Sequence, residues 1–331
     1  MLQWRDCVLL EELQQVRQLL ESHGLDFDQK ATYTGGLFED ERLLATGSLS
    51  HNVIEMLAVV SDYQNDHYMV EVLTHLLARL REKSIEKFFL FCKPKHRDIF
   101  LQNGFRILVE LSEITMFENR YPSIERNLQS LRDSCHFMPG SRAALVMNCN
   151  PLTNGHLYLI DACAKKYHQV LLFLVEEDRS VFPYAIRHAL LKEELKTRPN
   201  VMLLPSTVYQ ISTATFPTYF LKENSLRSRL QMELDVRIFK DYFMPIFSIQ
   251  VRMAGSEPLD PLTACYNQTM KTILKESFLE IPRLTYHDQV VSASLVRQYA
   301  KAGDYENIKA LVPPVTYEFL VSKKGQALFH G

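Results

Sequence analysis

The spacing of hydrophobic positions changes along the chain and divides it into two parts. Residues 7–23 and 70–80 carry apolar side chains at the three- and four-residue intervals typical of amphipathic helices. Short apolar runs around them predict strands, and Asn103-Gly104 ends a short predicted helix. The predicted strands are residues 32–36, 43–49, 53–60, 87–92, 105–111 and 114–117, and the short helix is 96–102. Residues 1–120 are therefore predicted to form an α+β domain.

After a predicted connecting helix at residues 121–140, strands alternate with helices. The predicted strands are 143–147, 169–174, 201–204, 248–253 and 283–286, and the predicted helices are 157–166, 185–196, 217–230, 261–276 and 293–301. This alternation is typical of α/β proteins with a parallel, doubly wound sheet, in which ligands bind at the carboxyl ends of the strands. Residues 141–331 are therefore predicted to form a Rossmann-like domain.

Charge and cysteine content give no sign of a nucleic-acid or membrane partner. The formal net charge is −2, no apolar run approaches the length needed to cross a bilayer, and the first residues lack a signal-peptide pattern. The six cysteines are scattered and include no C-x-x-C pair, which disfavours a disulfide framework or a zinc site. We therefore expect a cytoplasmic protein with no metal-ligating residues, whose anion binding depends on local arrangements.

The strongest candidate site is the polar loop at residues 148–156, between a predicted strand and a predicted helix. A helix that starts there points backbone N–H groups and the positive end of its dipole at a ligand above the strand, and phosphate suits such a site. Gly155 lets the backbone approach the ligand, and Thr153 or Asn154 can cap the helix. His156, protonated or donating from one nitrogen, can stabilise charge on a phosphate. The alternative is a solvated histidine in a capped first turn.

A second candidate lies at residues 291–297. Ser292 can cap the predicted helix, and Ser294 and Arg297 are three residues apart, on one helical face. Hydroxyls, unpaired N–H groups and a guanidinium would then converge on phosphate. The alternative is an ordinary capped helix.

Smaller candidates lie between these two stretches. Arg187 and Lys222 could contact a substrate, and Gly255 and Glu257 lie in a loop after a predicted strand. The alternatives are surface cations on helices and a plain turn.

The first stretch resembles the H/T-x-G-H signature of the nucleotidyltransferase superfamily, and the second resembles its I-S-x-(S/T)-x-x-R motif. The resemblance implies that ATP is a substrate, with Mg²⁺, and that His156 and Arg297 are catalytic. It also implies nucleotide contacts from Asn148, Asn150, Pro151, Thr153, Gly155, His156, Gly255, Glu257, Ser292, Ser294 and Arg297.

Residues 175–178, 212–222, 257–258, 266–267 and 292–294 further resemble the citrate lyase ligase family, and this resemblance covers essentially the whole chain. It implies that acetate and ATP form acetyl-adenylate and pyrophosphate. The thiol of a coenzyme-A-like prosthetic group on the acyl carrier protein of citrate lyase then takes the acetyl group, which activates the lyase. No cysteine of this chain is required as a nucleophile. Two alternatives stay open: an adenylyltransferase of the phosphopantetheine or mononucleotide type, and a non-catalytic binding module.

The first domain resembles the GNAT acetyltransferase fold in the order of its elements. GNAT enzymes bind coenzyme A pyrophosphate on a glycine-containing loop, whereas residues 62–68 contain no glycine and two aspartates. We therefore consider two roles, binding of acetyl-coenzyme A and docking of the carrier or its prosthetic group. A basic cluster, Lys93, Lys95, His96 and Arg97, could meet an acidic carrier.

Overall fold

A mixed seven-stranded sheet forms the first part of the computed structural model, which describes residues 1–63, 66–176, 180–210, 224–257, 260–286 and 289–330. The strand order is β1-β2-β3-β4-β5-β7-β6, and only the pair β4–β5 is parallel. The strands are β1 (Leu2–Asp6), β2 (Tyr33–Glu39), β3 (Arg42–Ser50), β4 (Val53–Val59), β5 (Phe89–Cys92), β6 (Phe105–Glu110) and β7 (Thr115–Asn119). The sequence did not predict β1, and it predicted the other six.

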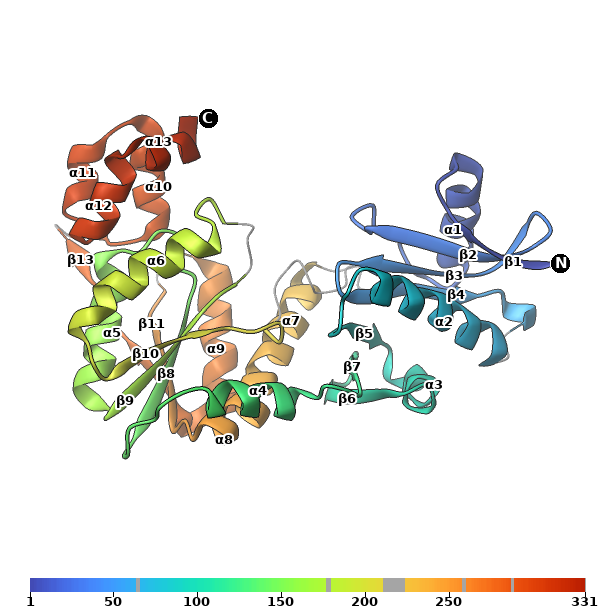
Figure 1. The fold of residues 1–331 in the computed structure, drawn as a ribbon, viewed down its shortest axis with the longest axis horizontal. Helices are drawn as coiled ribbons and strands as arrows, with labels where there is room; N and C mark the ends of the chain where they lie inside the picture. The colour runs from blue at the N-terminus through green and yellow to red at the C-terminus, as the bar shows by residue number, and fades with distance from the viewer. Residues whose placement is uncertain (64–65, 177–179, 211–223, 258–259, 287–288, 331) are drawn as a thin grey trace. The chain divides into compact units, whose positions relative to one another are not determined.

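Two helices, α1 (Leu10–Ser22) and α2 (Asp66–Glu82), pack on β3 and β4, and α3 (Arg97–Gln102) packs on β6 (Figure 1). The apolar face of α2 buries Val72, Leu73, Leu76 and Leu80, which matches the helical spacing in the sequence. This unit is the expected α+β half of the fold.

The chain divides into two compact units, Met1–Asn127 with α7 (Asn224–Ile238), and Leu128–Gln210 with Phe239–Gly331. The division falls within α4 (Ile124–Asp133), inside the predicted connecting region. The sequence placed α7 in the second domain and at residues 217–230, whereas α7 groups with the first unit and extends to Ile238. Residues 217–223 lie outside the described residues.

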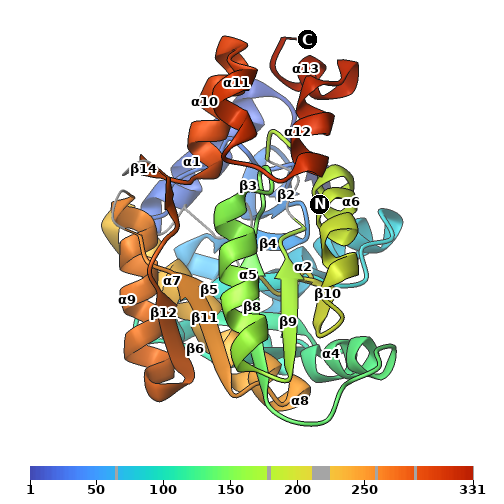
Figure 2. The same cartoon turned by 90° about the vertical axis from the view of Figure 1, so that its left-hand side faces the viewer.

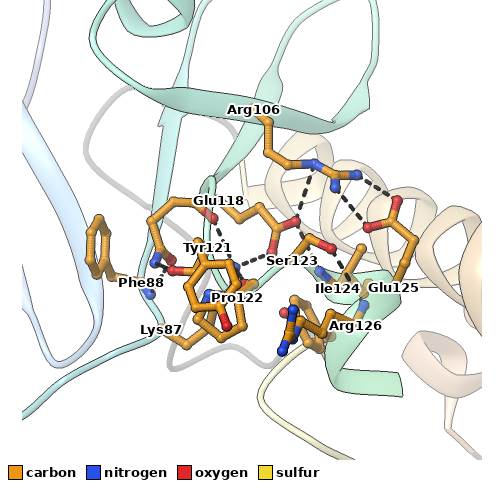
Figure 3. Close-up of polar contacts among 12 residues, drawn as sticks. Lys87, Phe88, Arg106, Glu118, Tyr121, Pro122, Ser123, Ile124, Glu125 and Arg126 are labelled. Atoms are coloured by element: carbon orange, nitrogen blue, oxygen red, sulfur yellow. Dashed lines mark hydrogen bonds and ion pairs between the residues drawn. The ribbon is translucent and has the colours of Figure 1, made fainter. Parts of the chain in front are cut away.

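A buried ion-pair network anchors the start of α4 to the sheet of the first unit (Figure 3). Glu118 is fully buried on β7, pairs with Lys87 and Arg106, and accepts a 3.1 Å hydrogen bond from the backbone N–H of Ile124. Arg106 also binds both carboxylate oxygens of Glu125, at 2.6 and 2.7 Å, and lowers the pKa of Glu125 to about 2. Two carboxylates at a helix N-terminus also complement its dipole.

The second unit contains a five-stranded sheet of order β10-β9-β8-β11-β12, in which every pair is parallel. The strands are β8 (Arg142–Met147), β9 (Gln169–Leu174), β10 (Val201–Pro205), β11 (Val251–Gly255) and β12 (Phe278–Ile281). The helices around the sheet are α5 (Asn154–Lys166), α6 (Tyr184–Glu194), α8 (Met244–Phe247) and α9 (Pro261–Leu274).

Both faces of this sheet are covered, as expected for a doubly wound α/β domain. One face packs on α5, which lies over β8 and β9 in Figure 2 and buries Leu157 and Ile160 against Leu172 and Leu174. On the other face Phe173 contacts three rings of the segment from Phe239 to Phe247. The strand order reverses at β8, because β9 and β10 lie on one side of it and β11 and β12 on the other.

The predicted fifth strand, residues 283–286, was wrong. The sheet ends with β12, and only Thr285–Tyr286 is extended, as β13 in a hairpin with β14 (Gln289–Val290). The helix predicted over 261–276 ends earlier, at Leu274, because Lys275 adopts a positive φ of 52°. Lys275–Ser277 then form a single 3-10 turn, and β12 begins directly after it at Phe278.

After the hairpin the chain forms four helices: α10 (Ala293–Ala302), α11 (Tyr305–Lys309), α12 (Pro314–Val321) and α13 (Lys323–His330). The sequence predicted only the first. Among the described residues, no helix is both long and apolar enough to cross a membrane.

Candidate functional site

The loop from Asn148 to Thr153 leaves the central strand β8 at the point where the strand order reverses, and leads directly into α5. Ligands of open α/β sheets bind in the crevice outside the carboxyl ends of the strands at such a point. The loop that follows β11 leaves the same edge of the sheet, because β8 and β11 are neighbouring parallel strands. The main candidate from the sequence therefore lies where the topology predicts a ligand.

Thr153 and His156 hold each other in the first turn of α5. Thr153 is the N-cap, and its hydroxyl accepts a hydrogen bond from the backbone N–H of His156. The backbone N–H of Thr153 donates to Nδ1 of His156 at 3.0 Å, and the Thr153 hydroxyl lies 2.8 Å from the same nitrogen. Of the two caps considered, Thr153 is thus the one used. Its side chain is buried, so we assign it a positioning role towards the ring.

These contacts determine which nitrogen of His156 can serve a ligand. Since Nδ1 accepts from a backbone N–H, the neutral ring carries its proton on Nε2. Burial and, secondarily, the positive charge of Arg283 lower the pKa of His156 to about 4, so the ring is neutral at pH 7. In the described part of the chain Nε2 has no hydrogen-bond partner. His156 therefore offers one N–H donor at the start of α5.

The second stretch from the sequence packs directly on the first. A Cβ atom at Gly155 would lie 2.9 Å from the carbonyl oxygen of Val291, so the close approach of the two loops requires glycine there. From α10, Arg297 donates to the carbonyl of Asn150 and, at 3.1 Å, to the hydroxyl of Ser294. The two stretches, far apart in the sequence, thus form one site.

The start of α10 is also built as the sequence predicted. Ser292 is its N-cap and accepts from the backbone N–H of Leu295 at 3.2 Å. Ser294 is exposed and Arg297 is half-buried, and burial lowers the pKa of the Arg297 guanidinium. Within the described residues Arg297 has no carboxylate partner. Its charge is therefore available to an anion.

Arg187 supports the first loop from inside. It is completely buried, and its guanidinium donates to the carbonyl groups of Asn148, Val175 and Phe182 at 2.6 to 3.0 Å. These bonds join the ends of β8 and β9 to the start of α6. A direct substrate contact of Arg187 stays a prediction, and its burial argues against it.

The other loop residues are held by neighbours as well. The side-chain oxygen of Asn150 accepts from the backbone N–H of Phe182 at 3.0 Å, and the amide of Asn148 contacts the hydroxyl of Ser180. Pro151 is buried and follows a cis peptide bond. The second predicted substrate residue, Lys222, lies outside the described residues.

Gly255 and Glu257 belong to the loop after β11. The carbonyl of Gly255 accepts from the side chain of the buried Asn267 at 2.9 Å, and Glu257 forms an ion pair with Arg283. Sequence reasoning placed Arg283 only in a strand and missed it as a site residue. No local signal could have found it, because its partner lies 26 positions earlier and its charge acts on a histidine more than a hundred positions away.

No group of three or more His, Cys, Asp or Glu side chains is arranged to hold a metal ion in the part of the chain that the structure describes. The chemistry that the site offers is recognition of an anion by N–H groups, hydroxyls and guanidinium groups. This set of donors suits phosphate groups.

Comparison with known proteins identifies the family of the chain. A family model described as the citrate lyase ligase C-terminal domain matches residues 142–320. The citrate (pro-3S)-lyase ligase of Escherichia coli strain K12 is 32% identical over 320 residues, which are 94% of this chain and 90% of the relative. The enzyme of the same name from Klebsiella pneumoniae is 33% identical over 290 residues, 85% of this chain and 84% of the relative.

Among solved structures, an acyl-CoA N-acyltransferase from Pseudomonas aeruginosa has 16% identity and a TM-score of 0.30, over 36% of this chain and 99% of that one. The family assignment rests on the family model, which spans residues 142–320, and on the two relatives, which cover 94% and 85% of this chain. The chain belongs to the citrate lyase ligase family.

Proposed function

We propose that this ligase uses ATP and acetate to acetylate the thiol of the coenzyme-A-like prosthetic group on the acyl carrier protein of citrate lyase. One observation carries the proposal in the structure: His156 and Arg297, from stretches 141 residues apart, meet at the loop after β8 in a chain of the citrate lyase ligase family. Family membership supports the lyase as the protein acted upon.

In the first step an acetate oxygen attacks the α-phosphorus of ATP. The bond from that phosphorus to the bridging oxygen breaks, and pyrophosphate leaves with its electron pair. Nε2–H of His156 and the Arg297 guanidinium would stabilise the negative charge that builds on the departing phosphates. Ser294 adds a hydroxyl donor held by Arg297.

In the second step the carrier thiolate attacks the acetyl carbon of acetyl-adenylate. The bond from this carbon to the phosphate oxygen breaks, AMP leaves, and a thioester forms, while the thiol proton passes to solvent. Cys149 is the cysteine of the nucleotide loop, but it is buried, and burial raises its pKa to about 12. An enzyme-bound acetyl group on Cys149 is therefore not part of the proposal.

Mg²⁺ is proposed as part of the ATP complex. Since the described residues offer no metal-binding cluster, the triphosphate itself would supply the oxygen ligands. The chain contributes the cationic and N–H donors named above, and no step of the proposal requires a protein-held metal.

The proposal assigns a different role to each of the two domains. Residues 141–331 carry the adenylation chemistry, residues 121–140 connect the domains, and residues 1–120 dock the carrier or its prosthetic group. Of the predicted basic cluster, Lys93 and Lys95 follow β5 on the first unit and suit an acidic partner. Burial lowers the pKa of His96, and Arg97 pairs with Glu110, so these two add less positive charge. A cytoplasmic location is also proposed, and the six free cysteines suit a reducing compartment.

The proposal can be tested by measuring the transfer of labelled acetyl groups to the carrier. The purified protein is incubated with ATP, Mg²⁺, labelled acetate and the citrate lyase carrier, and thioester and AMP are measured. Equal amounts of acetyl thioester and AMP are expected. Without the carrier, no thioester should form, and AMP should not exceed a single turnover. Pyrophosphate release driven by phosphopantetheine or a mononucleotide, and not by acetate, would instead identify an adenylyltransferase.

A further inference from the structure

Arg283 lies beside the nucleotide loop without belonging to either family motif. It follows β12, and its backbone N–H donates to the hydroxyl of Ser256 at 3.2 Å, while the N–H of Ser256 donates to the carbonyl of Ile281 at 2.7 Å. The side chain then runs over Gly255, with its Cγ atom 3.7 Å from where a Cβ atom of that glycine would be. The main chain thus directs this arginine across the end of β11.

The guanidinium is held on one side only. It pairs with Glu257, whose side chain is 5% exposed, whereas the Arg283 side chain is 28% exposed. Arginine has five N–H donors. Across the described ranges, the Nε and Nη1 atoms of Arg283 have no hydrogen-bond partner. Most of the donor face therefore remains open to a ligand.

The side chain of Arg283 lies beside α5, because a Cβ atom at Gly255 would be 3.7 Å from Cγ of Arg283 and 3.9 Å from Cδ2 of Leu159, a residue of α5. The charge of Arg283 is one of the two causes that lower the pKa of His156, so the guanidinium lies near enough to disfavour a second positive charge on the ring. Arg297 adds another cation at the same loop, with no carboxylate partner in the described part of the protein. Two guanidinium groups and an N–H donor at the carboxyl ends of β8 and β11 concentrate positive potential there.

We propose that Arg283 binds the triphosphate of ATP from the β12 side of the loop that follows β8, and that Glu257 holds its guanidinium in place for this contact. The proposal rests on the proposed function only for the identity of the ligand. A planar guanidinium can bind two phosphate oxygens at once, which a lysine at this position could not do. Glu257, predicted from the sequence to contact the nucleotide, would then act through Arg283.

The competing explanation is that the pair of Arg283 and Glu257 only fastens the loop after β11 to the loop after β12. Both accounts predict some loss of stability when either residue is changed. They differ in what the two residues do to ATP, because only Arg283 would touch it. The comparison of the two single variants therefore separates the accounts.

The experiment measures the dissociation constant of ATP with Mg²⁺ by calorimetry for wild type, Arg283→Gln, Arg283→Lys and Glu257→Gln. Arg198→Gln is the matched control, because Arg198 is also a partly buried arginine in a carboxylate pair, with Asp161 at 2.6 Å, and precedes β10 at the opposite edge of the sheet. We expect Arg283→Gln to weaken ATP binding about tenfold to a hundredfold, as for loss of a hydrogen bond between charged groups. Arg283→Lys restores part of it, Glu257→Gln loses less, and Arg198→Gln stays within twofold of wild type.

A second readout is the pKa of His156, followed by NMR of its ring. It should rise in Arg283→Gln and stay unchanged in Arg198→Gln. The inference is overturned if ATP affinity in Arg283→Gln stays within twofold of wild type, or if Glu257→Gln loses as much as Arg283→Gln. An absence of acetate-dependent turnover in wild type, with ATP affinity still reduced in Arg283→Gln, would sink the proposed function and leave this inference standing.

Discussion

Replacement of His156 by alanine tests the proposed phosphate site at its centre. The change removes the Nε2–H donor and also the Nδ1 acceptor for the backbone N–H of Thr153. The first loss concerns catalysis and the second concerns folding. The hydroxyl of Thr153 still caps α5, because it accepts from the backbone N–H of residue 156, which alanine retains.

The two costs can be estimated separately. Removal of one preorganised donor from a site of developing negative charge costs about 2.7–4 kcal/mol of transition-state stabilisation, or roughly a hundredfold to a thousandfold in rate. Loss of the acceptor leaves the N–H of the buried Thr153 unpaired, which costs about 1–3 kcal/mol of folding free energy. A typical stability margin of about 5–15 kcal/mol absorbs that cost, so the variant should fold.

The assay is acetate-dependent exchange of labelled pyrophosphate into ATP, with urea unfolding as the measure of stability. His168→Ala is a close control, because Nδ1 of His168 accepts from the backbone N–H of Ser141 at 3.2 Å, much as Nδ1 of His156 accepts from Thr153. Ser141 precedes β8 and His168 precedes β9, so this pair lies at the opposite edge of the sheet. We expect exchange to fall at least a hundredfold in His156→Ala and to stay within twofold of wild type in His168→Ala.

The pH profile adds a further test. With a pKa of about 4, the neutral ring is the active form in this account, and exchange should not fall between pH 6 and pH 8 through titration of His156. If the imidazolium were required, only about one molecule in a thousand would be active at pH 7, and the rate would fall about tenfold per pH unit above pH 5. Such a fall, or a His156→Ala variant within fivefold of wild type, would refute the reasoning.

Three further predictions concern stability and packing. Burial raises the pKa of Glu55 from its ordinary value of 4.5 to about 8, and its Oε1 atom has no partner among the described residues. The unfolded chain therefore ionises this group first, and the folded protein loses stability between about pH 4.5 and pH 8 and no more above that range. In urea unfolding, Glu55→Gln should match wild type at pH 5 and be more stable by roughly 3–5 kcal/mol at pH 9, and equal pH dependence of the two proteins would contradict this. Glu118→Gln leaves the positive charges of Lys87 and Arg106 beside an uncharged side chain, and should lower the free energy of unfolding by about 3–5 kcal/mol. An unchanged melting temperature would show that the network contributes little to stability. Gly155→Ala places a Cβ atom 2.9 Å from the carbonyl oxygen of Val291, and should lower the free energy of unfolding by about 1–3 kcal/mol and also lower exchange activity. Exchange at the wild-type rate would show that activity does not require such a close approach of the two loops.

The sequence predicted the strand, the loop at residues 148–153 and the helix after it well, because their signals are local. An apolar run ends at Met147, a capping residue follows at Thr153, and a helical pattern begins directly after it. One short stretch of sequence therefore contains all the signals for the strand, the loop and the helix. The same holds for Ser292 and Arg297 on α10. The caps and the contact of Arg297 with Ser294 were found where the spacing placed them.

What the sequence could not predict depends on contacts between distant residues. The strand β12 has only four residues and lies between the predicted helix at 261–276 and the predicted strand at 283–286, so the sequence assigned it to neither. Arg187 looked like a surface cation, but it is buried because three backbone carbonyls converge on it. Arg283 was missed because its ion pair with Glu257 and its effect on the pKa of His156 join residues that are far apart in the sequence.

Acetate-dependent exchange of pyrophosphate into ATP by the purified wild-type protein, with Mg²⁺ and without any carrier, tests the central claim most directly. The account predicts exchange that requires acetate, because the nucleotide site around His156 and Arg297 would form acetyl-adenylate reversibly before the thiol arrives. Exchange that appears only with a phosphorylated acceptor, or no exchange with acetate although ATP binds, would contradict it.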